Sequence, residues 1–462
     1  MKIYRRNQRS VLSMAMNLTQ KLFAAHLAEP AELVPGQEIK VTVDQTLTHD
    51  INAVMAYLAF EALDLDRVRT KLSVSYIDHN LLQIDNKTPD DHIYLQSIAQ
   101  KYGLVLSKAG NGICHALQCS RFGKPGTLLL GGDSHTPSCG ALGMLAIGVG
   151  GMDIAVALAG FPYVMKMPKV VKVNLKGRLR PGTAAKDIIL EMLRRTTVKG
   201  GVGKVYEYVG EGVETLSIPE RLTIANMGAE MGATTSVFPA DGQVRAFLKA
   251  QGREQDYTEW LPDAGCGYDE EIQLDLDALE PLVACPHMPD NVMKVADVPK
   301  IPVQQVFIGS CTNGSYSDFK KVALVLKEHK INPDVSLVLG ISSRQIYLRL
   351  LQDGVIADLV DSGARITEFA CGPCCGIGIA PSSKGISVRT SNRNFKGRSS
   401  TADASLYLVS PEVAAATAIK GRLALPQEVM DDVSVLGTVK EPETYPINDN
   451  LFLLPPEDGR DI

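Results

Sequence analysis

Three cysteines in two short glycine-rich motifs are the residues of this chain best suited to chemistry. Cys311 lies in IGSCTNGS, and Cys371 and Cys374 form a C-x-x-C in FACGPCCG. Iron–sulfur clusters are normally held by four cysteines, so three would leave one iron open as a Lewis acid for a substrate hydroxyl and carboxylate. A C-x-x-C can equally be a redox dithiol, half of a zinc site or two unrelated buried thiols, and the cysteines alone leave these alternatives open.

Histidines and carboxylates occupy three further polar motifs. They are Asp78-His79 in SVSYIDHN, His115 in GNGICHAL, and Asp133-Ser134-His135 in GGDSHTPS. A carboxylate beside a histidine orients the ring and raises its pKa, which suits a general acid. Each histidine taken alone could instead be a hydrogen-bonded structural residue.

Two arginines and a helical pair add groups suited to a carboxylate substrate. Arg393 and Arg398 lie five apart in SNRNFKGR and could hold carboxylates bidentately, although an exposed salt bridge is the commoner role. Asn226 and Glu230 lie four apart and share one face of a predicted helix. An open iron, oriented histidines and paired arginines together suit the removal and return of water in a hydroxy acid.

The polar motifs follow predicted strands. Short β-branched runs alternate with helical stretches, which predicts an α/β fold. Apolar segments such as Thr127–Leu130, Val303–Ile308 and Ile386–Arg389 run directly into the polar turns, and a helix is expected over Tyr316–His329. Ligands of open α/β sheets bind at the carboxyl ends of strands, so we expect these turns to converge on one cleft.

Length and composition exclude several classes. The chain has 462 residues, 45% hydrophobic and 21% charged, which predicts two to four globular domains. The net charge of −5, without a basic block, gives nucleic-acid binding no support, and no apolar run is long enough to span a membrane. Nine cysteines without a secretory signal favour a cytoplasmic location. The basic start, with no acid before Glu29, leaves a mitochondrial transit peptide as the alternative.

Taken together, the motifs resemble the aconitase superfamily. The resemblance rests on YIDHN, NGICHAL, GGDSHTPS, TVKGGVGKVYEY, NMGAEMGATTSVFP, IGSCTNGS, ACGPC and SNRNFKGR, and runs from about residue 17 to about residue 425. It implies three α/β/α domains of the iron–sulfur type around a central cleft, with one [4Fe-4S] cluster per chain. We expect an N-terminal extension at 1–16, domains at 17–168, 169–298 and 299–425, the last with the cluster ligands, and a linker or tail at 426–462.

The resemblance also implies roles for individual residues. Cys311, Cys371 and Cys374 would hold the cluster, and Asp78 with His79 would protonate the leaving hydroxyl. His115 with Asp133, and His135 with Glu230, would be supporting pairs. Ser134, Arg393 and Arg398 would bind substrate carboxylates, and Asn226 and Asn392 would line the cluster. His49 would contact substrate at a position where many aconitases have Gln and the isopropylmalate isomerase branch has His.

The function implied is a hydro-lyase acting on a hydroxy di- or tricarboxylate. CGPC and NMGAEMGATTSVFP resemble the aconitase branch, so citrate and isocitrate, interconverted through cis-aconitate, are expected first. The alternatives are 3-isopropylmalate dehydratase, homoaconitase and dimethylmalate dehydratase.

A separate small subunit is the expected partner. Single-chain aconitases carry a swivelling fourth domain, and only residues 426–462 follow the third domain here. The non-enzymatic alternative, a cluster-free RNA-binding regulator, is disfavoured by the intact cysteine triad and the absence of excess basic charge.

Overall fold

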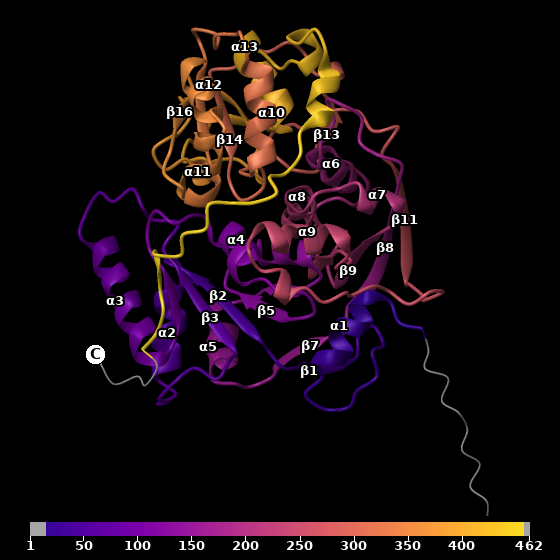
Figure 1. Cartoon of the computed structure of the whole chain (residues 1–462), viewed down its shortest axis with the longest axis vertical. Helices are drawn as coiled ribbons and strands as arrows, with labels where there is room; N and C mark the ends of the chain where they lie inside the picture. Colours follow the sequence, from indigo (N-terminus) through magenta and orange to yellow (C-terminus); the bar gives the residue numbers. More distant parts are fainter. Residues whose placement is uncertain (1–14, 457–462) are drawn as a thin grey trace, which may run out of the picture.

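Residues 15–456 are described by a computed structural model, in which four β-sheets carry helices on their faces (Figure 1). The predicted α/β fold class is confirmed. The predicted extension 1–16 lies almost entirely outside the described residues. The domain boundaries stay predictions: β8 (Lys169–Lys176) begins at the predicted start of the second domain, but a hairpin at residues 282–294 already belongs to the sheet of the third predicted domain.

The first large sheet contains the strands that lead into the histidine motifs. Its order is β19 (Phe452–Leu453), β4 (Val105–Ser107), β3 (Leu72–Tyr76), β2 (Gln45–His49), β5 (Leu128–Gly131) and β6 (Leu145–Gly148). All are parallel except β19. The strands are buried on both faces, as is usual for parallel sheets covered by crossover helices.

Helices cover both faces of this sheet because alternate strand residues point to opposite sides. One face packs on α1 (Leu18–His26), α2 (Ala53–Glu61), α3 (Lys87–Tyr102) and α5 (Gly151–Leu158). The other packs on α4 (Cys114–Leu117), the π-helix η1 (Gln118–Phe122), the 3₁₀ helix η2 (Thr136–Leu142) and α9 (Gly242–Ala250). A two-stranded ribbon of β1 (Glu38–Val41) and β7 (Tyr163–Lys166) lies beside it.

The second large sheet is fully parallel. Its order is β10 (Thr235–Val237), β9 (Lys204–Val209), β8 (Lys169–Lys176) and β11 (Glu270–Asp275). Its core includes α6 (Ala185–Thr196) and α8 (Ile218–Gly228). A capping box between Ser217 and Glu220 starts α8, which passes at its end into the 3₁₀ helix η3 (Ala229–Met231).

The third large sheet carries the cysteine and arginine motifs. Its order is β13 (Val292–Lys294), β12 (Leu282–Ala284), β18 (Ser405–Leu408), β17 (Ile386–Arg389), β14 (Gln305–Gly309), β15 (Ser336–Gly340) and β16 (Arg365–Ile366). Its core includes α10 (Tyr316–Leu326), α11 (Arg344–Gln352), α12 (Val355–Asp361) and α13 (Pro411–Lys420). Helix α10 ends three residues before the predicted His329.

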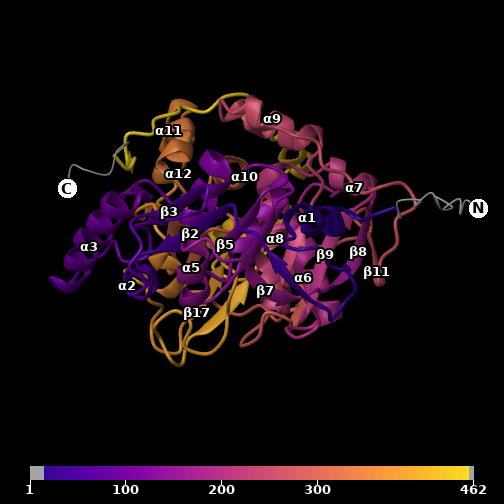
Figure 2. The same cartoon turned by 90° about the horizontal axis from the view of Figure 1, so that it is seen from below.

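The C-terminal segment, predicted as a linker or tail, packs along the body of the protein. It leaves the third sheet and crosses the front of the molecule as an irregular segment, coloured yellow in Figure 1. It ends as β19, which pairs with β4. Leu436 is buried on the way, and Arg121 forms an ion pair with Asp449. Figure 2 shows the same segment bridging α9 and α11 at the edge of the molecule.

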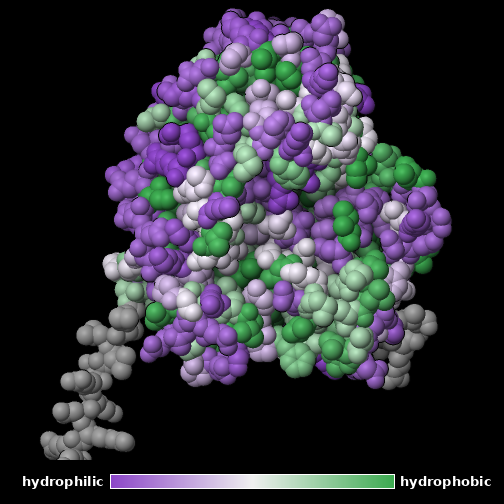
Figure 3. Space-filling model, turned by 180° about the vertical axis from the view of Figure 1, so that it is seen from behind, coloured by the Kyte–Doolittle hydropathy of each residue, from purple (hydrophilic) through white to green (hydrophobic). Residues whose placement is uncertain are grey.

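The surface behind this segment is uneven in polarity. Figure 3 shows hydrophobic side chains gathered on the lower part of the rear face, where α2 and α5 lie. Met55 on α2 and Met152 on α5 are 71% and 68% exposed. Within residues 15–456, no helix is both long and apolar enough to cross a bilayer.

Candidate active site

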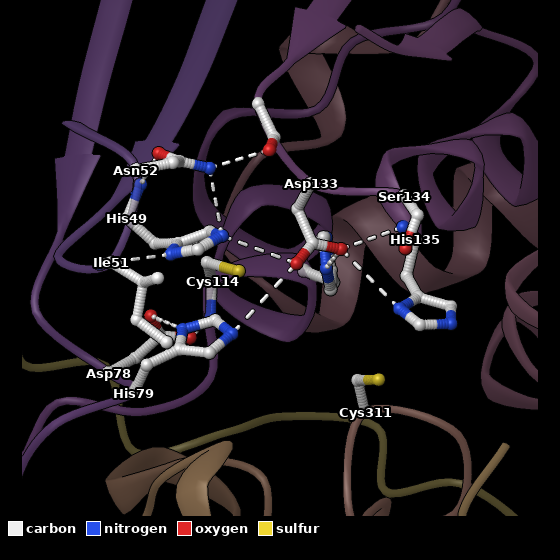
Figure 4. A network of polar contacts seen from close by, with 12 residues as sticks. His49, Ile51, Asn52, Asp78, His79, Cys114, Asp133, Ser134, His135 and Cys311 are labelled. Atoms are coloured by element: carbon white, nitrogen blue, oxygen red, sulfur yellow. Dashed lines mark hydrogen bonds and ion pairs between the residues drawn. The ribbon is translucent and has the colours of Figure 1, made fainter. Parts of the chain in front are cut away.

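A single half-buried carboxylate, Asp133, gathers several histidines at the carboxyl edge of the first sheet (Figure 4). It follows β5 by two residues. One oxygen lies 2.9 Å from His115 Nε2 and accepts the backbone N–H of His135 at 2.7 Å. The other lies 3.3 Å from His49 Nε2 and 3.8 Å from His79 Nε2. Burial acts to raise its pKa, but the charge of His115 and the hydrogen bonds from the rings hold that pKa well below its usual range.

The Asp78–His79 pair is formed as the sequence predicts. His79 Nδ1 lies 2.8 Å from Asp78 Oδ1, and the ring stacks on His49 with centroids 3.9 Å apart. Burial opposes a charged ring, yet the Asp78 carboxylate, followed by Cys371, raises the pKa of His79 well above its usual value. His79 therefore carries a proton that its Nε2 can present toward the Asp133 side.

Asp50 fixes the turn that holds this pair, and the sequence analysis missed it. Its oxygens accept the backbone N–H groups of His79 at 3.0 Å and Asn80 at 2.8 Å, and one lies 3.2 Å from His92 Nε2. Burial acts against its charge, but these hydrogen bonds, led by that of His92, lower the pKa of Asp50 to about 2. The available signal was its place beside His49 in THDIN, directly after a strand.

A second network joins the other motifs across three sheets. His135 Nε2 lies 2.9 Å from Glu230 Oε1, as expected for that pair. Arg393 Nε donates to both Glu230 oxygens at 2.9 and 3.0 Å, and its Nη2 donates to Ser134 Oγ at 2.8 Å. Glu230 lies in η3 rather than in the same helix as Asn226, so the predicted shared helical face is interrupted at Gly228. The guanidinium of Arg393 is already positioned by two partners.

Cys311 lies in a turn whose backbone is unusual. It follows β14, and the two residues before it, Gly309 and Ser310, have φ of 142° and 70°, the second a conformation that costs energy for a residue with a side chain. The turn brings the Cys311 sulfur to 3.2 Å from Asn226 Nδ2 and 3.5 Å from Asn392 Nδ2. Both amides donate to the sulfur, and their role in lining a cluster stays a prediction.

The C-x-x-C lies against the histidine motif. The backbone N–H of Cys371 donates to the Asp78 carbonyl at 2.7 Å. Position 372 must be glycine, because a Cβ there would lie 2.7 Å from the His79 carbonyl oxygen. Cys374 is in the 3₁₀ helix η6 (Gly372–Cys375), and its sulfur lies 3.8 Å from Arg398 Nη2. The Nε of Arg398 is buried and finds no hydrogen-bond partner among the described residues.

The donor set fits an iron–sulfur cluster better than one metal ion. Within residues 15–456, the groups of three ligand atoms close enough for one ion contain histidines and carboxylates but no cysteine sulfur. Asn392 nevertheless contacts two of the thiols, with its Nδ2 3.5 Å from the Cys311 sulfur and its Oδ1 3.7 Å from the Cys374 sulfur. Burial, and then the charges of Cys371 and Cys374, raise the pKa of Cys311 well above its usual value. Sulfurs that bind different irons of one cluster can be farther apart, and N–H donors beside them stabilise their thiolate charge.

A buried lysine ties the cysteine turn to the arginine turn, and no pattern in the sequence indicated it. Lys186 on α6 donates to the carbonyls of Thr390 at 2.6 Å and Ser391 at 2.9 Å, and to Asn313 Oδ1 at 3.3 Å. Burial lowers its pKa to about 7. In AKDIILEMLRR it reads as a surface residue between charged neighbours.

Comparisons with known proteins cover this whole region. The model of the Aconitase family (aconitate hydratase) matches residues 20–301 and 296–421. The 3-isopropylmalate dehydratase large subunit 1 of Thermotoga maritima is 36% identical over 417 residues, covering 90% of this chain and 99% of that protein. The large subunit of the same enzyme in Caldanaerobacter subterraneus is 37% identical over 421 residues, covering 90% and 100%. The crystal structure of aconitase X from Thermococcus kodakaraensis aligns over 77% of this chain and 84% of that one, with 13% identity and a TM-score of 0.45.

Proposed function

Because this chain belongs to the aconitase family and is a hydro-lyase, we propose that it is the large subunit of a 3-isopropylmalate dehydratase. The relatives that it matches over nearly their full length carry that name. Citrate, the substrate expected first, has less support: it rests on CGPC and NMGAEMGATTSVFP, whereas the relatives' names favour the alternative. Because the chain belongs to an enzyme family, the alternative of a cluster-free RNA-binding regulator has no support.

The observation that carries the proposal is the acid pair Asp78–His79 lying against the C-x-x-C. The N–H of Cys371 is bonded to the Asp78 carbonyl, and His79 holds its proton between Asp78 and Asp133. A protonated imidazole of this kind can give its proton to a departing hydroxyl. Since its Nδ1 is held by Asp78, the proton available to substrate is the one on Nε2.

Cys311, Cys371 and Cys374 are the residues that would hold a [4Fe-4S] cluster. When bound, its open iron would supply Lewis-acid chemistry for the substrate hydroxyl and carboxylate. Asn226 and Asn392 would steady the thiolate of Cys311 through their N–H groups.

The arginines would hold the two carboxylates common to malate-type substrates. Arg398 has an unpartnered, buried Nε, which offers a donor to a ligand. Arg393 is held by Glu230 and Ser134, so its remaining donors point in a fixed direction before substrate arrives. His115 and His135 would keep these groups in place through Asp133 and Glu230 rather than by contact with substrate.

His49 is the residue of the site that best separates the two candidate substrates. It stacks on His79 and lies 3.3 Å from Asp133, so it is part of the acid network itself. A histidine at this position resembles the isopropylmalate branch, and its ring neighbours Ile51, whose N–H donates to His49 Nδ1.

A separate small subunit would complete the site. The relatives are named as large subunits, and the exposed apolar side chains of α2 and α5 offer this partner a surface beside the site. It would supply the base that removes the α-proton, an effect typically worth about 10²–10⁴-fold. We propose the cytoplasm as the location; the relatives are bacterial and archaeal, which gives the mitochondrial alternative no support.

The test is an anaerobic assay of the cluster-loaded chain, alone and with the small subunit that co-purifies with a tagged copy from its source cell. The complex should convert 2- and 3-isopropylmalate, and the chain alone should not. Turnover of citrate without isopropylmalate would overturn the substrate assignment. Full turnover by the chain alone would overturn the divided site.

A further inference from the structure

Two buried cysteines outside the cluster motifs face each other behind the site. Cys119 in η1 and Cys139 in η2 have their sulfurs 3.4 Å apart, and the residues are 1% and 0% exposed. A disulfide needs about 2.05 Å, so the sulfurs would have to approach by only about 1.4 Å. Neither cysteine has a role in the proposed hydration chemistry.

A small, partly open cavity has Cys119 in its lining. Its volume is about 50 Å³, and its lining includes Cys119, Ser120, Phe247, Cys311 and, from the C-terminal segment, Tyr445. A water molecule needs roughly 10–15 Å³ of such space, so the cavity holds a few water-sized molecules. Hydrogen peroxide fits this space, whereas a peptide disulfide such as oxidised glutathione does not. Cys139 lies behind Cys119 and does not line the cavity.

A short series of hydrogen bonds connects Ser138, the neighbour of Cys139, to Cys311. Ser138 donates to the His135 carbonyl at 2.6 Å and accepts from Asn226 Nδ2 at 2.9 Å. The same Asn226 nitrogen donates to Cys311 at 3.2 Å. A movement of Cys139 toward Cys119 therefore displaces the residue that orients the amide donor of Cys311.

We propose that Cys119 and Cys139 are a redox modification site, in which hydrogen peroxide entering the cavity converts the two thiols into a disulfide. The Cys119 sulfur attacks one peroxide oxygen, the O–O bond breaks, and a sulfenic acid and one water form. The Cys139 sulfur then attacks the Cys119 sulfur, the S–O bond breaks, and the second water leaves with the Cys139 proton. The two sulfurs lose two electrons in total, and these reduce the two peroxide oxygens.

Oxidation of this cysteine pair would weaken the hydrogen bond from Asn226 to the Cys311 sulfur. Peroxide that enters the cavity meets Cys119 and Cys311 together, because both line it. Formation of the disulfide removes that molecule of peroxide and, through Ser138 and Asn226, loosens the N–H donor to Cys311. A thiol reductant restores both.

Peptide mapping of the full-length chain tests the modification without relying on activity. The reduced, cluster-free protein is treated with hydrogen peroxide or with oxidised glutathione, its free thiols are alkylated, and it is digested with trypsin without reduction. Peroxide should link the peptide 109–121 to the peptide 122–166, at least about ten times faster than oxidised glutathione does. Cys114 shares the first peptide, so Cys114→Ala is the matched control and should keep the link, whereas Cys119→Ala and Cys139→Ala should each abolish it.

Iron release tests the connection to the cluster cysteine. After the same peroxide treatment, the cluster-loaded chain should lose iron to a chelator at least about three times faster than cluster-loaded Cys119→Ala, because direct attack of peroxide on the open iron acts equally on both. The modification site is refuted if peroxide oxidises the partly exposed Cys371 and Cys375 of the cluster-free chain while Cys119 and Cys139 stay reduced. An equal rate of linking by oxidised glutathione would refute the route through the cavity.

Discussion

Replacement of Arg393 by lysine tests whether the shape of the guanidinium, rather than its charge, organises the site. Its Nε lies 2.9 and 3.0 Å from the two oxygens of Glu230, and its Nη2 lies 2.8 Å from Ser134 Oγ. Lysine keeps the charge but has one nitrogen, which cannot reach both partners in the directions that a planar fork reaches. At least one of these contacts must therefore be lost.

The expected cost follows from that loss. A hydrogen bond to a charged group contributes about 1.5–3 kcal/mol, equivalent to roughly ten- to a hundredfold in an equilibrium. The Arg393 side chain is 25% exposed and that of Glu230 10%, so water screens the pair in part and the effect should lie near the lower end. We expect kcat/KM for isopropylmalate to fall about tenfold, through weaker substrate binding.

The assay compares Arg393→Lys with Arg422→Lys in complex with the small subunit. Arg422 is a matched control, because it pairs with Glu428 outside the site and its side chain is 26% exposed. The control should change kcat/KM less than about twofold, and equal melting temperatures of the two variants would show that the fold is intact. A change below about threefold in Arg393→Lys, with substrate affinity unaltered, would refute the reasoning.

Single substitutions also test the cluster ligands, the stability of the C-terminal segment and subunit docking. Serine at Cys311, Cys371 or Cys374 should abolish iron and sulfide binding, and Cys375→Ser should keep it. If Cys375→Ser loses the cluster while Cys374→Ser keeps it, the ligand assignment is wrong. Burial raises the pKa of Glu441 from 4.5 to about 7, so the folded state binds this proton more tightly and stability falls as pH rises between those values. Glu441→Gln should raise the free energy of unfolding in urea by roughly 2–3 kcal/mol at about pH 8 and little near pH 4.5; a difference that does not vary with pH would contradict this. Met55→Glu should weaken small-subunit binding about tenfold or more by calorimetry, whereas Val202→Glu, at a position 68% exposed on the second-sheet side, should not; equal effects would exclude the α2–α5 face.

The sequence indicated which residues lie together most clearly where a motif follows a strand directly. Asp133 comes after β5 and His79 after β3, and the parallel strands of one sheet place such turns at one edge, whereas Cys311 follows β14 of another sheet. The pairs His115–Asp133 and His135–Glu230 were expected from family resemblance, and their geometry in the structure agrees. Local pattern alone would not have paired residues 95 positions apart.

The residues that the sequence did not reveal are held by long-range packing. Lys186 reads as a solvated helix residue, and only the approach of α6 to the turns after β14 and β17 makes it a buried donor. Asp50 accepts hydrogen bonds from backbone N–H groups about thirty residues away. Because every residue type except proline has such a group, the sequence does not indicate this contact. Cys119 and Cys139 lie in short helices of the same core, and their spacing of twenty residues carries no period.

The charged residues of the site do not distinguish between the two candidate substrates. Asp133, Glu230 and Arg393 lie beside three different sheets; His135 links Asp133 to Glu230, and Glu230 pairs with Arg393. These groups suit the two carboxylates and the hydroxyl that citrate and isopropylmalate share. The substrates differ in one substituent, a charged carboxymethyl group or an apolar isopropyl group. Burying an isopropyl group gains about 2 kcal/mol at roughly 0.8 kcal/mol per buried carbon, but only beside apolar side chains. On this chain Ile51, 57% exposed next to His49, offers such a surface, and the proposed small subunit would supply the rest of the pocket.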